Sequence, residues 1–272
     1  MKISVVTAAF NSGATLRDTM ESVLRQTWTD FEYIVVDGLS KDDTMEIVRE
    51  YEPRFGGRLR WISEPDKGIY DAMNKGFAMA TGDVVGILNS DDFFSSDDIL
   101  GKVAAAMADE SIDAVYGDIH YVNGDNLSKC VRYYSSREFR RWQMRLGFIP
   151  AHPSFYCRRA IYEKYGTFNA SYRLSADFEL LLRLIFIHRI RIHYLPLDFV
   201  TMRTGGATTS GFESYKKGIQ EHLRAYRDND VCSNIFLDCI RFPVKLTALM
   251  LFRLKTLLHL PVGNLRTDRP RT

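Results

Sequence analysis

The hydrophobic positions from the N-terminus to about residue 90 follow two alternating patterns. Continuous apolar runs rich in β-branched residues predict strands that are covered on both faces. These runs are ISVVT at 3–7, FEYIVVD at 31–37, LRWIS at 59–63 and VVGIL at 84–88. The stretches between them have helical spacing, and the third of these helices is expected to start at Gly68. This regular alternation predicts right-handed crossovers and a mostly parallel α/β sheet.

Two of the predicted helices carry capping signals. Thr15 and Asp18 have the spacing of a capping box ahead of an apolar helical face. Ser40 and Asp43 can cap a second helix that runs to about Tyr51. We therefore expect side-chain caps at both helix starts.

Polar and acidic residues follow the predicted strands, at 7–11, 37–40, 64–67 and 89–92. Ligands of parallel α/β sheets bind outside the carboxyl ends of the strands, so this edge is where chemistry is expected. Asp37 is placed there to accept hydrogen bonds from a base or ribose, although a capping or turn role in DGLS is the alternative.

The edge also carries two adjacent carboxylates, Asp91 and Asp92. Two such charges in a cleft repel each other unless a cation or hydrogen-bond donors compensate them. Oxygen ligands of this kind suit Mg²⁺ or Mn²⁺, with water and a diphosphate completing the coordination. A solvated turn is the simpler interpretation of the motif taken alone. The sequence contains neither GxxxxGK[ST] nor GxGxxG to bind phosphates in another way.

Charge and cysteine content limit the class of protein. The 36 Lys and Arg nearly balance the 34 Asp and Glu, which argues against a nucleic-acid-binding protein. The four cysteines form no CxxC pair and lie at no zinc-site spacing, so a reducing cytosol is the simpler compartment. The N-terminal residues show no signal peptide, and no segment reaches the ~20 apolar residues of a membrane span.

The C-terminal region is distinctly basic, with seven basic residues and one acidic residue from Arg241 onward. Within it, segment 242–260 has the pattern of an amphipathic helix. Its basic side comprises Arg241, Lys245, Arg253 and Lys255, and its apolar side comprises Leu246, Met250, Leu254, Leu257 and Leu258. This pattern is typical of a helix in a membrane interface, and we expect a cytoplasmic protein that is peripheral on the inner face of the cytoplasmic membrane. A helix docked on the body or in a homodimer interface is the alternative.

Three ordered segments of the chain are TAAFNSGATLRDTMESVLRQTWTDFEYIVVDGLSKDDT, ISEPDKGIYDAMNKG and GDVVGILNSDD. They resemble the nucleotide-sugar half of family 2 glycosyltransferases of the GT-A fold. The resemblance covers about 2–206 and is closest to bacterial members that build polysaccharide and lipopolysaccharide repeats. It implies a Rossmann-like, mostly parallel sheet flanked by helices, with a C-terminal helical extension. The expected parts are a donor half at 1–120, an acceptor half at 121–206 and a helical tail at 207–272.

The resemblance also implies site residues. Asp37 would contact the base or ribose, Ser90 to Asp92 would match the DxD-type diphosphate motif, and Asp91 and Asp92 would bind Mn²⁺ or Mg²⁺. The other expected nucleotide-sugar contacts are Thr7, Ala8, Asn11, Lys67 and Asn74. The sequence departs from the commoner form at Asn89, where many relatives have Asp, so the ligand that bonds the metal directly stays open.

Segment 173–184, RLSADFELLLRL, resembles the family segment that carries the catalytic base. Ala176 stands where the family has its first acid, so Asp177 is the matching base; a carboxylate favoured at a helix N-terminus is the alternative. AHPSFYCRRAIYEKYGTFN resembles the family's preceding connector, and His152 in it is either an acceptor-site or a packed residue. RTGG at 203–206 is either a flexible loop near the diphosphate or a glycine turn.

The resemblance implies an inverting, metal-dependent hexosyl-type transfer in cell-surface glycan synthesis, such as lipopolysaccharide or capsule. The donor would be a UDP, GDP or dTDP sugar, and the acceptor a hydroxyl of a glycan or polyprenyl-linked lipid. One alternative is a non-catalytic sugar-nucleotide or glycan-binding module on the same fold. Another is a sugar nucleotidyltransferase, which should show a Gly-rich basic phosphate loop that AAFNSGATL does not provide.

Overall fold

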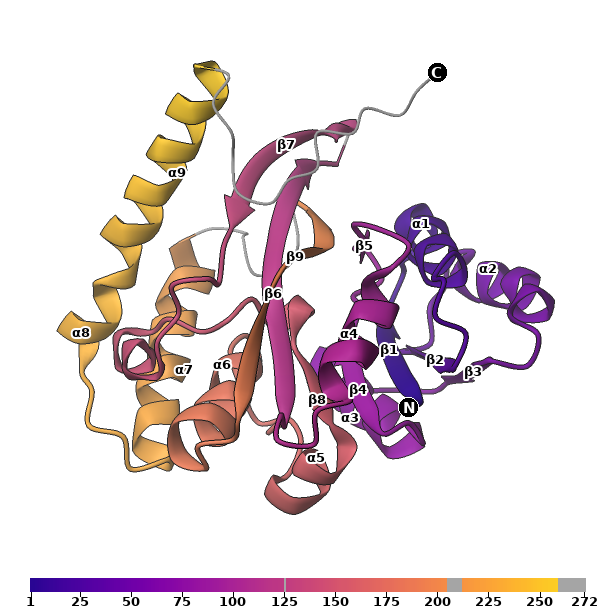
Figure 1. Ribbon diagram of the computed structural model, residues 1–272, viewed down its shortest axis with the longest axis horizontal. Coiled ribbons are helices and arrows are strands. Elements are labelled where there is room, and N and C mark those ends of the chain that lie inside the picture. Colours follow the sequence, from indigo (N-terminus) through magenta and orange to yellow (C-terminus); the bar gives the residue numbers. More distant parts are fainter. Residues whose placement is uncertain (125, 205–211, 259–272) are drawn as a thin grey trace.

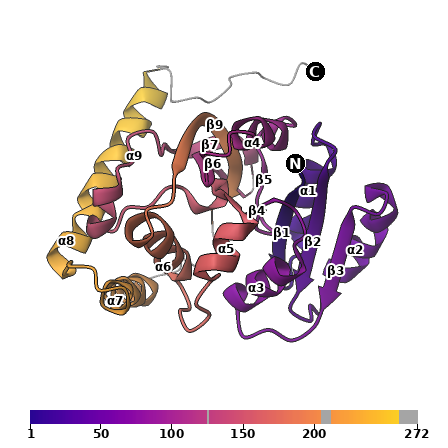
Figure 2. The ribbon, with the colours of Figure 1, turned by 60° about the horizontal axis from the view of Figure 1, so that its bottom comes forward.

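The structure is a computed structural model that describes residues 1–124, 126–204 and 212–258 (Figure 1). One sheet runs through these residues with the strand order β3-β2-β1-β4-β8-β6-β9-β5, and β7 pairs with β6. Helices flank this sheet, and the last helices stand beside its far half (Figures 1 and 2). This is the expected α/β architecture with a C-terminal helical extension.

The N-terminal half forms the predicted parallel sheet. Its strands are β1 (Ile3–Ala9), β2 (Phe31–Asp37), β3 (Leu59–Ser63) and β4 (Val84–Ile87), and every pairing among them is parallel. Its helices are α1 (Gly13–Leu24), α2 (Thr44–Tyr51) and α3 (Ile69–Met79). The strand and helix predictions for this half are therefore confirmed to within a few residues.

The two predicted side-chain caps are wrong. Helix α1 begins at Gly13, so Thr15 lies inside it, and neither α1 nor α2 has a side-chain hydrogen bond at its cap. The Thr15 hydroxyl donates instead to the carbonyl of Ser90, at 2.9 Å. The Ser40 hydroxyl donates to the Asp37 carboxylate. Both hydroxyls hold loops at the carboxyl edge of the sheet, where tertiary contacts outweigh the local capping pattern.

Beyond β4 the sheet is mixed. Its strands are β5 (Phe93–Phe94), β6 (Ala114–Asn123), β7 (Asn126–Tyr134), β8 (Tyr156–Arg158) and β9 (Ile192–Arg203). The short β8 inserts antiparallel between β4 and β6, while β9 runs parallel to β6 and antiparallel to β5. Strand β6 contains the predicted strand VYGD.

The helices of this half are α4 (Ile99–Met107), α5 (Arg159–Tyr165) and α6 (Ala176–Leu181). Helix α6 continues into a π-helical turn at Leu182–Ile187. Short 3₁₀ turns lie at Glu52–Phe55, Arg141–Leu146 and His152–Ser154.

The two faces of the sheet are covered by different helices. Helix α3 packs on one face, where Val6 and Val36 contact Met73 and Phe77 in one core cluster. Helices α1, α2 and α4 cover the other face, where the core is formed by apolar side chains such as Val35. Because successive side chains of a strand point to opposite faces, the continuous apolar runs supply both cores at once.

Three helices complete the chain: α7 (Phe212–Asp228), α8 (Ile235–Cys239) and α9 (Arg241–Leu257). They are joined by a buried polar network around Asp238, whose carboxylate lies 2.8 Å from Nδ1 of His222 and 3.1 Å from Nη2 of Arg241. The His222 ring stacks on Phe178 of α6 with centroids 3.7 Å apart. No helix among the described residues is long and apolar enough to cross a membrane. Positions 205–206 of RTGG and the predicted tail beyond 258 lie outside the described residues.

Candidate active site

The turn at Asn89–Asp92 follows β4 directly and is held by side chains of α1. The Thr15 hydroxyl donates to the Ser90 carbonyl at 2.9 Å, and the Thr19 hydroxyl donates to the Asp92 carbonyl at 2.7 Å. The hydroxyls of Ser90 and Ser12 lie 2.8 Å apart. Helix α1 therefore fixes the backbone that carries the two carboxylates.

The two carboxylates have different surroundings. Asp92 is only 1% exposed; its Oδ1 accepts from the backbone N–H of Arg203 at 3.2 Å, and its Oδ2 accepts from Nδ2 of Asn89 at 3.1 Å. Asp91 is half-buried, and no other described residue hydrogen-bonds its carboxylate. Asn89 thus orients Asp92 and leaves Asp91 open.

Both carboxylates are electrostatically unfavourable as ionised groups. Burial, followed by the charge of Asp91, raises the pKa of Asp92 to about 7. Burial also raises the pKa of Asp91, and the nearby Arg203 only partly opposes this. The Arg203 guanidinium is bound to the Asp91 carbonyl at 2.5 Å and to the carboxylate of Asp18. The pair therefore needs further positive charge to be stable in its ionised form.

These residues fit a hard divalent cation. No group of three or more His, Cys, Asp or Glu side chains gathers at a metal-binding distance in the described part of the chain. Mg²⁺-type sites, however, often use one or two carboxylates and leave the other positions to water and substrate phosphates. The open carboxylate of Asp91, with Asp92 behind it, meets that requirement, and the missing positive charge is what the cation would supply.

The predicted nucleotide-binding residues differ in burial: Thr7, Ala8 and Asp37 are buried, whereas Asn11 is exposed. Thr7 and Ala8 are buried, and the Thr7 hydroxyl is used within the core, where it donates to the Leu88 carbonyl at 2.6 Å. Asp37 is also fully buried, and its Oδ2 accepts from the Ser63 hydroxyl at 2.6 Å. Asn11 is exposed, and its Oδ1 accepts from a loop N–H at 2.9 Å. Asp37 and Asn11 therefore order the loops at the carboxyl edge of the sheet through their side chains.

Sequence reasoning missed two large apolar side chains at this edge. Phe10 is 61% exposed and Leu39 is 47% exposed, in the loops that follow β1 and β2. A methyl group at Gly38 would lie 2.3 Å from the Asp66 carboxylate and 3.3 Å from the Phe10 ring. The side chains of Asp66 and Phe10 therefore pack directly against Gly38. Exposed aromatic surface beside polar groups suits a nucleotide base. The one sequence signal that could have pointed to Phe10 is that an aromatic residue stands directly before Asn11.

Asp177 lies in the first turn of α6 and faces an element of the N-terminal half. The Tyr70 hydroxyl, in the first turn of α3, donates to Oδ1 of Asp177 at 3.3 Å. Burial, together with the Asp177 charge, raises the pKa of Tyr70 well above its usual range. The Tyr70 hydroxyl therefore stays protonated and continues to donate this hydrogen bond. Since α3 begins at the carboxyl edge of the sheet, this contact brings Asp177 to the edge that carries Asp37 and Asp91.

The other predicted residues of this region gather around Phe168. The Phe168 ring stacks on Tyr70 with centroids 5.4 Å apart, and it meets the edge of His152 at 5.8 Å. The Asn74 amide makes two hydrogen bonds with the Phe168 backbone: its Nδ2 donates to the carbonyl at 2.8 Å, and its Oδ1 accepts from the N–H at 3.0 Å. Burial lowers the pKa of His152, and the charge of Asp177 opposes the shift. Lys67 is exposed in the loop before α3.

The segment before Asp177 is fixed by two groups that sequence reasoning did not single out. The Glu221 carboxylate of α7 accepts from the backbone N–H groups of residues 173, 174 and 175 at 2.8–2.9 Å. Arg183 is paired with Glu179 at 2.9 Å and donates to the Thr167 carbonyl at 2.7 Å. The contacts of Glu221 with residues 173–175 and of Arg183 with Thr167 join segments that are not adjacent in the chain, so local sequence patterns do not reveal them.

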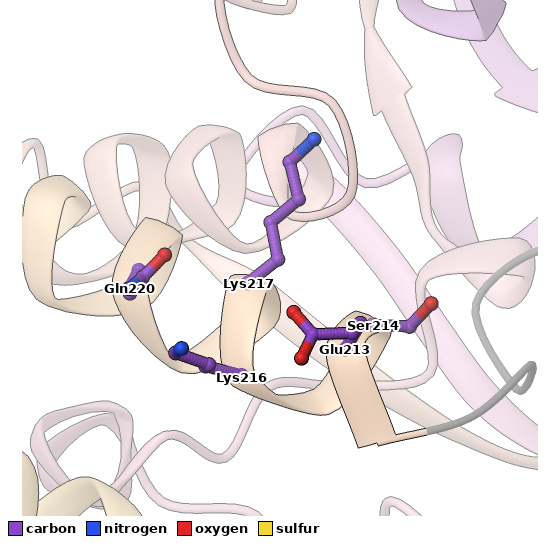
Figure 3. Close-up of a pocket in the computed structure, with 5 residues that line it drawn as sticks. All are labelled: Glu213, Ser214, Lys216, Lys217 and Gln220. Carbon is purple, nitrogen blue, oxygen red and sulfur yellow. The ribbon is translucent and has the colours of Figure 1, made fainter.

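A cavity of about 350 Å³ opens on the first turns of α7, a turn or two before Glu221. Figure 3 shows Lys217 extending away from the first turn, where Glu213 and Ser214 lie. Lys216 and Gln220 complete the lining. The lining is polar and charged of both signs.

The protein is therefore an α/β protein with a carboxylate pair and an exposed aromatic side chain at one edge of its sheet. A further carboxylate, Asp177, lies at the start of a helix and contacts the same edge through Tyr70. Solved structures with the same fold are GT-A glycosyltransferases. They include TarS of S. aureus (TM-score 0.64, 20% identity, 85% of this chain and 40% of that one). GalNAc-T7 in complex with UDP, GalNAc and Mn²⁺ is similar too (TM-score 0.63, 18% identity, 84% of this chain and 48% of that one).

Sequence comparison leads from the fold to the family. The model of glycosyl transferase family 2 matches residues 4–166, and the chain belongs to that family. A PGL/p-HBAD biosynthesis glycosyltransferase of Mycobacterium tuberculosis is 33% identical over 66% of this chain and 68% of its own length. Chondroitin synthase of Pasteurella multocida is 28% identical over 67% of this chain and 18% of its own length. The predicted GT-A fold and family are confirmed.

Proposed function

We propose that this glycosyltransferase moves a hexose from a nucleoside-diphosphate sugar to a hydroxyl of a glycan or lipid-linked acceptor, with inversion at the anomeric carbon. The observation that carries the proposal is the contact between Asp177 and Tyr70. It links a carboxylate of the proposed acceptor half to the sheet edge that bears the carboxylate pair, which supports one site for donor and acceptor.

The donor would bind along the carboxyl edge of β1, β2 and β4. Phe10 and Leu39 offer apolar surface to the base, and the loop ordered by Asp37 and Asn11 supplies polar groups to the nucleoside. Two neighbours of the fold support a nucleotide-sugar donor, since TarS was solved with UDP-GlcNAc and a mannosyltransferase from Pyrobaculum calidifontis with GDP-Man and Mn²⁺. Lys67 and Ser90 are the further proposed donor contacts.

Asp91 and Asp92 would hold Mn²⁺ or Mg²⁺ beside the donor diphosphate. When bound, the cation supplies Lewis-acid stabilisation of the charge that grows on the leaving diphosphate. Asn89 and the backbone N–H of Arg203 hold Asp92 in place, while Asp91 faces the incoming group. The Arg203 guanidinium adds positive charge at the same turn.

Asp177 would take the proton from the acceptor hydroxyl as that oxygen attacks the anomeric carbon. Glu221 fixes the backbone before Asp177, and Tyr70 orients the carboxylate through Oδ1, so that Oδ2 can face the acceptor. His152, held neutral by burial, is the proposed polar contact for the acceptor. We further propose that the product belongs to cell-surface glycan synthesis; the mycobacterial relative is named for a role in PGL/p-HBAD biosynthesis.

The substitution Asp177→Asn tests this assignment. The amide keeps the size of the side chain and an oxygen for Tyr70, but it cannot accept the proton, so transfer should fall by about 10²–10⁴-fold. Binding of the nucleotide in the presence of Mn²⁺ should stay within about threefold of wild type, because Asp177 lies outside the proposed donor contacts. Transfer is measured as release of the nucleoside diphosphate, and binding by calorimetry.

Glu163→Gln on α5 is the matched control, because Glu163 is an exposed carboxylate that pairs with Arg159. Near-normal turnover in Asp177→Asn would remove the assignment of the base. Absence of metal-dependent donor hydrolysis in the wild-type protein would favour a non-catalytic sugar-nucleotide-binding module instead.

A further inference from the structure

Among the described residues of α9, the less exposed side chains are Arg241, Phe242, Lys245, Leu249 and Phe252, so the helix turns a mixed basic and apolar side toward the body of the protein. Arg241 is only 8% exposed and is paired with the buried Asp238, and Lys245 one turn later is half-buried. Burial lowers the pKa of Lys245 to about 8. The helix packs against α8 and β7 on this side, and Figure 1 shows it standing along the flank of the molecule.

The opposite side of α9 is apolar and exposed. Side chains spaced by three or four residues along the helix form a continuous stripe. Its members, each about half exposed or more, are Val244, Leu246, Met250, Leu251, Leu254, Leu257 and Leu258. The helix contacts the body through its other side, so this stripe is left uncovered by the described residues.

The stripe continues onto α8. Phe236 is 83% exposed, Ile235 46% and Ile240 39%, and these residues directly precede α9 in the chain. Continuous apolar surfaces of this kind are rare on proteins that work alone in water, and they mark interaction sites. We call the exposed apolar side chains of α8 and α9 the α8–α9 surface.

Charge distinguishes the partner that this surface fits. Arg253 and Lys255 are exposed, and at 100° per residue they fall at the two edges of the stripe. Long cationic side chains in such positions reach up to lipid headgroups while the apolar face enters the acyl boundary. A protein partner would need two acidic groups matched to these edges, whereas an anionic bilayer supplies negative charge at any point.

We propose that the α8–α9 surface lies in the headgroup region of an anionic lipid bilayer and holds the enzyme at the membrane without spanning it. This inference goes beyond the proposed transfer and concerns binding alone. The surface is connected to the site, since Asp238 of α8 contacts His222, whose ring stacks on Phe178 beside Asp177. If the proposed function holds, the bilayer lies on the acceptor side of the site, where a lipid-linked acceptor would arrive.

Vesicle co-sedimentation of the full-length chain, without donor or acceptor, tests the proposal. The wild-type protein should bind phosphatidylglycerol–phosphatidylcholine vesicles and bind phosphatidylcholine alone more weakly. The double variant Leu251→Glu, Leu254→Glu should lose about tenfold or more in binding, because it places two charges on the inserted face. Arg253→Gln with Lys255→Gln should also lose about tenfold or more, but only toward the anionic vesicles.

The matched control is Ala105→Glu with Ile187→Glu, which adds the same charge at exposed positions of α4 and of the π-helical turn. It should bind as the wild type does. Equal binding by the Leu251, Leu254 variant, or no binding by the wild type to either vesicle, would overturn the proposal. A wild-type dimer in light scattering that this variant converts to a monomer would show that the surface is a homodimer interface. Since no readout uses catalysis, failure of the proposed transfer is judged separately.

Discussion

Asp91 and Asp92 are neighbours in the chain, yet the fold gives them different tasks. Asp92 is buried and accepts two hydrogen bonds, one from Asn89 and one from the backbone of Arg203. Asp91 has an open carboxylate. The sequence left open which of the two bonds a metal directly, and these contacts favour Asp91 as the direct ligand, with Asp92 setting the local charge and holding the turn.

The substitutions Asp91→Asn and Asp92→Asn should therefore differ. Asp91→Asn should weaken the Mn²⁺-dependent binding of nucleotide by about tenfold or more, because a ligand of the cation is lost, and should leave the apo melting temperature near that of wild type. Asp92→Asn should change apo stability by about 1 kcal/mol or more, because a buried hydrogen-bonded group is altered. Calorimetric titration with and without Mn²⁺ and urea unfolding measure the two effects.

Asp30→Asn is the control for this pair, since Asp30 is an exposed carboxylate before β2 that contacts the N-terminal amine. It should leave both quantities unchanged. Full Mn²⁺ dependence in Asp91→Asn would show that Asp91 is not the ligand.

At the scale of elements, the apolar pattern predicted the parallel half well because β1, β2 and β4 are buried on both faces. FEYIVVD and LRWIS match β2 and β3 residue for residue. The local capping signals failed because the hydroxyls of Thr15 and Ser40 bind loops brought close by the fold. The three-residue β8 carries no periodic signal, so its antiparallel insertion next to β4 could not be predicted.

A buried carboxylate, that of Glu32, also holds the parallel half together by binding groups near β1 and β4. Glu32 of β2 accepts from the Ser4 hydroxyl of β1 at 2.7 Å and from the Thr81 backbone N–H before β4 at 2.6 Å. Lys2 lies 3.0 Å from its other oxygen. Although burial alone would raise the pKa of Glu32, these hydrogen bonds lower it to about 2.

Glu32 should therefore make stability depend on pH in the acid range. Its folded pKa lies below its unfolded pKa of ~4.5, so the stabilisation is complete above about pH 4.5 and is lost as the pH falls toward about 2. Glu32→Gln should cost about 1–3 kcal/mol near pH 7, and the difference from wild type should shrink across that window. Urea unfolding at a series of pH values measures it.

Glu46→Gln, at an exposed position of α2, should follow the wild-type profile. A difference between Glu32→Gln and wild type that does not change between pH 5 and the acid limit of folding would contradict the role of the Glu32 charge.

At the scale of the whole molecule, the site forms where the parallel half meets the mixed half. The proposed donor edge could be predicted because it follows from the strand ends, such as Asp37 and Asp91. Asp177 could be proposed as the base only through resemblance to the family, since its partner Tyr70 is more than a hundred residues away in the chain. Phe10, Glu221 and Arg183 were not predicted, because the exposure of Phe10 and the tertiary contacts of Glu221 and Arg183 are not encoded in any local pattern.

The proposed donor would bind the folded protein at this edge, so it should raise the melting temperature by mass action. At a concentration about 100-fold above its dissociation constant, a donor adds about 2.7 kcal/mol, which corresponds to a shift of roughly 5–10 °C for a chain of this size. We expect one nucleotide class among UDP, GDP and dTDP sugars to give this shift with Mn²⁺, and EDTA to reduce it strongly. Phe10→Ser should weaken the shift through lost base contact, whereas Asp177→Asn should keep it. If no nucleotide sugar shifts the melting temperature with or without metal, the donor site is misassigned; a shift that Phe10→Ser leaves intact would place the base away from the exposed aromatic ring.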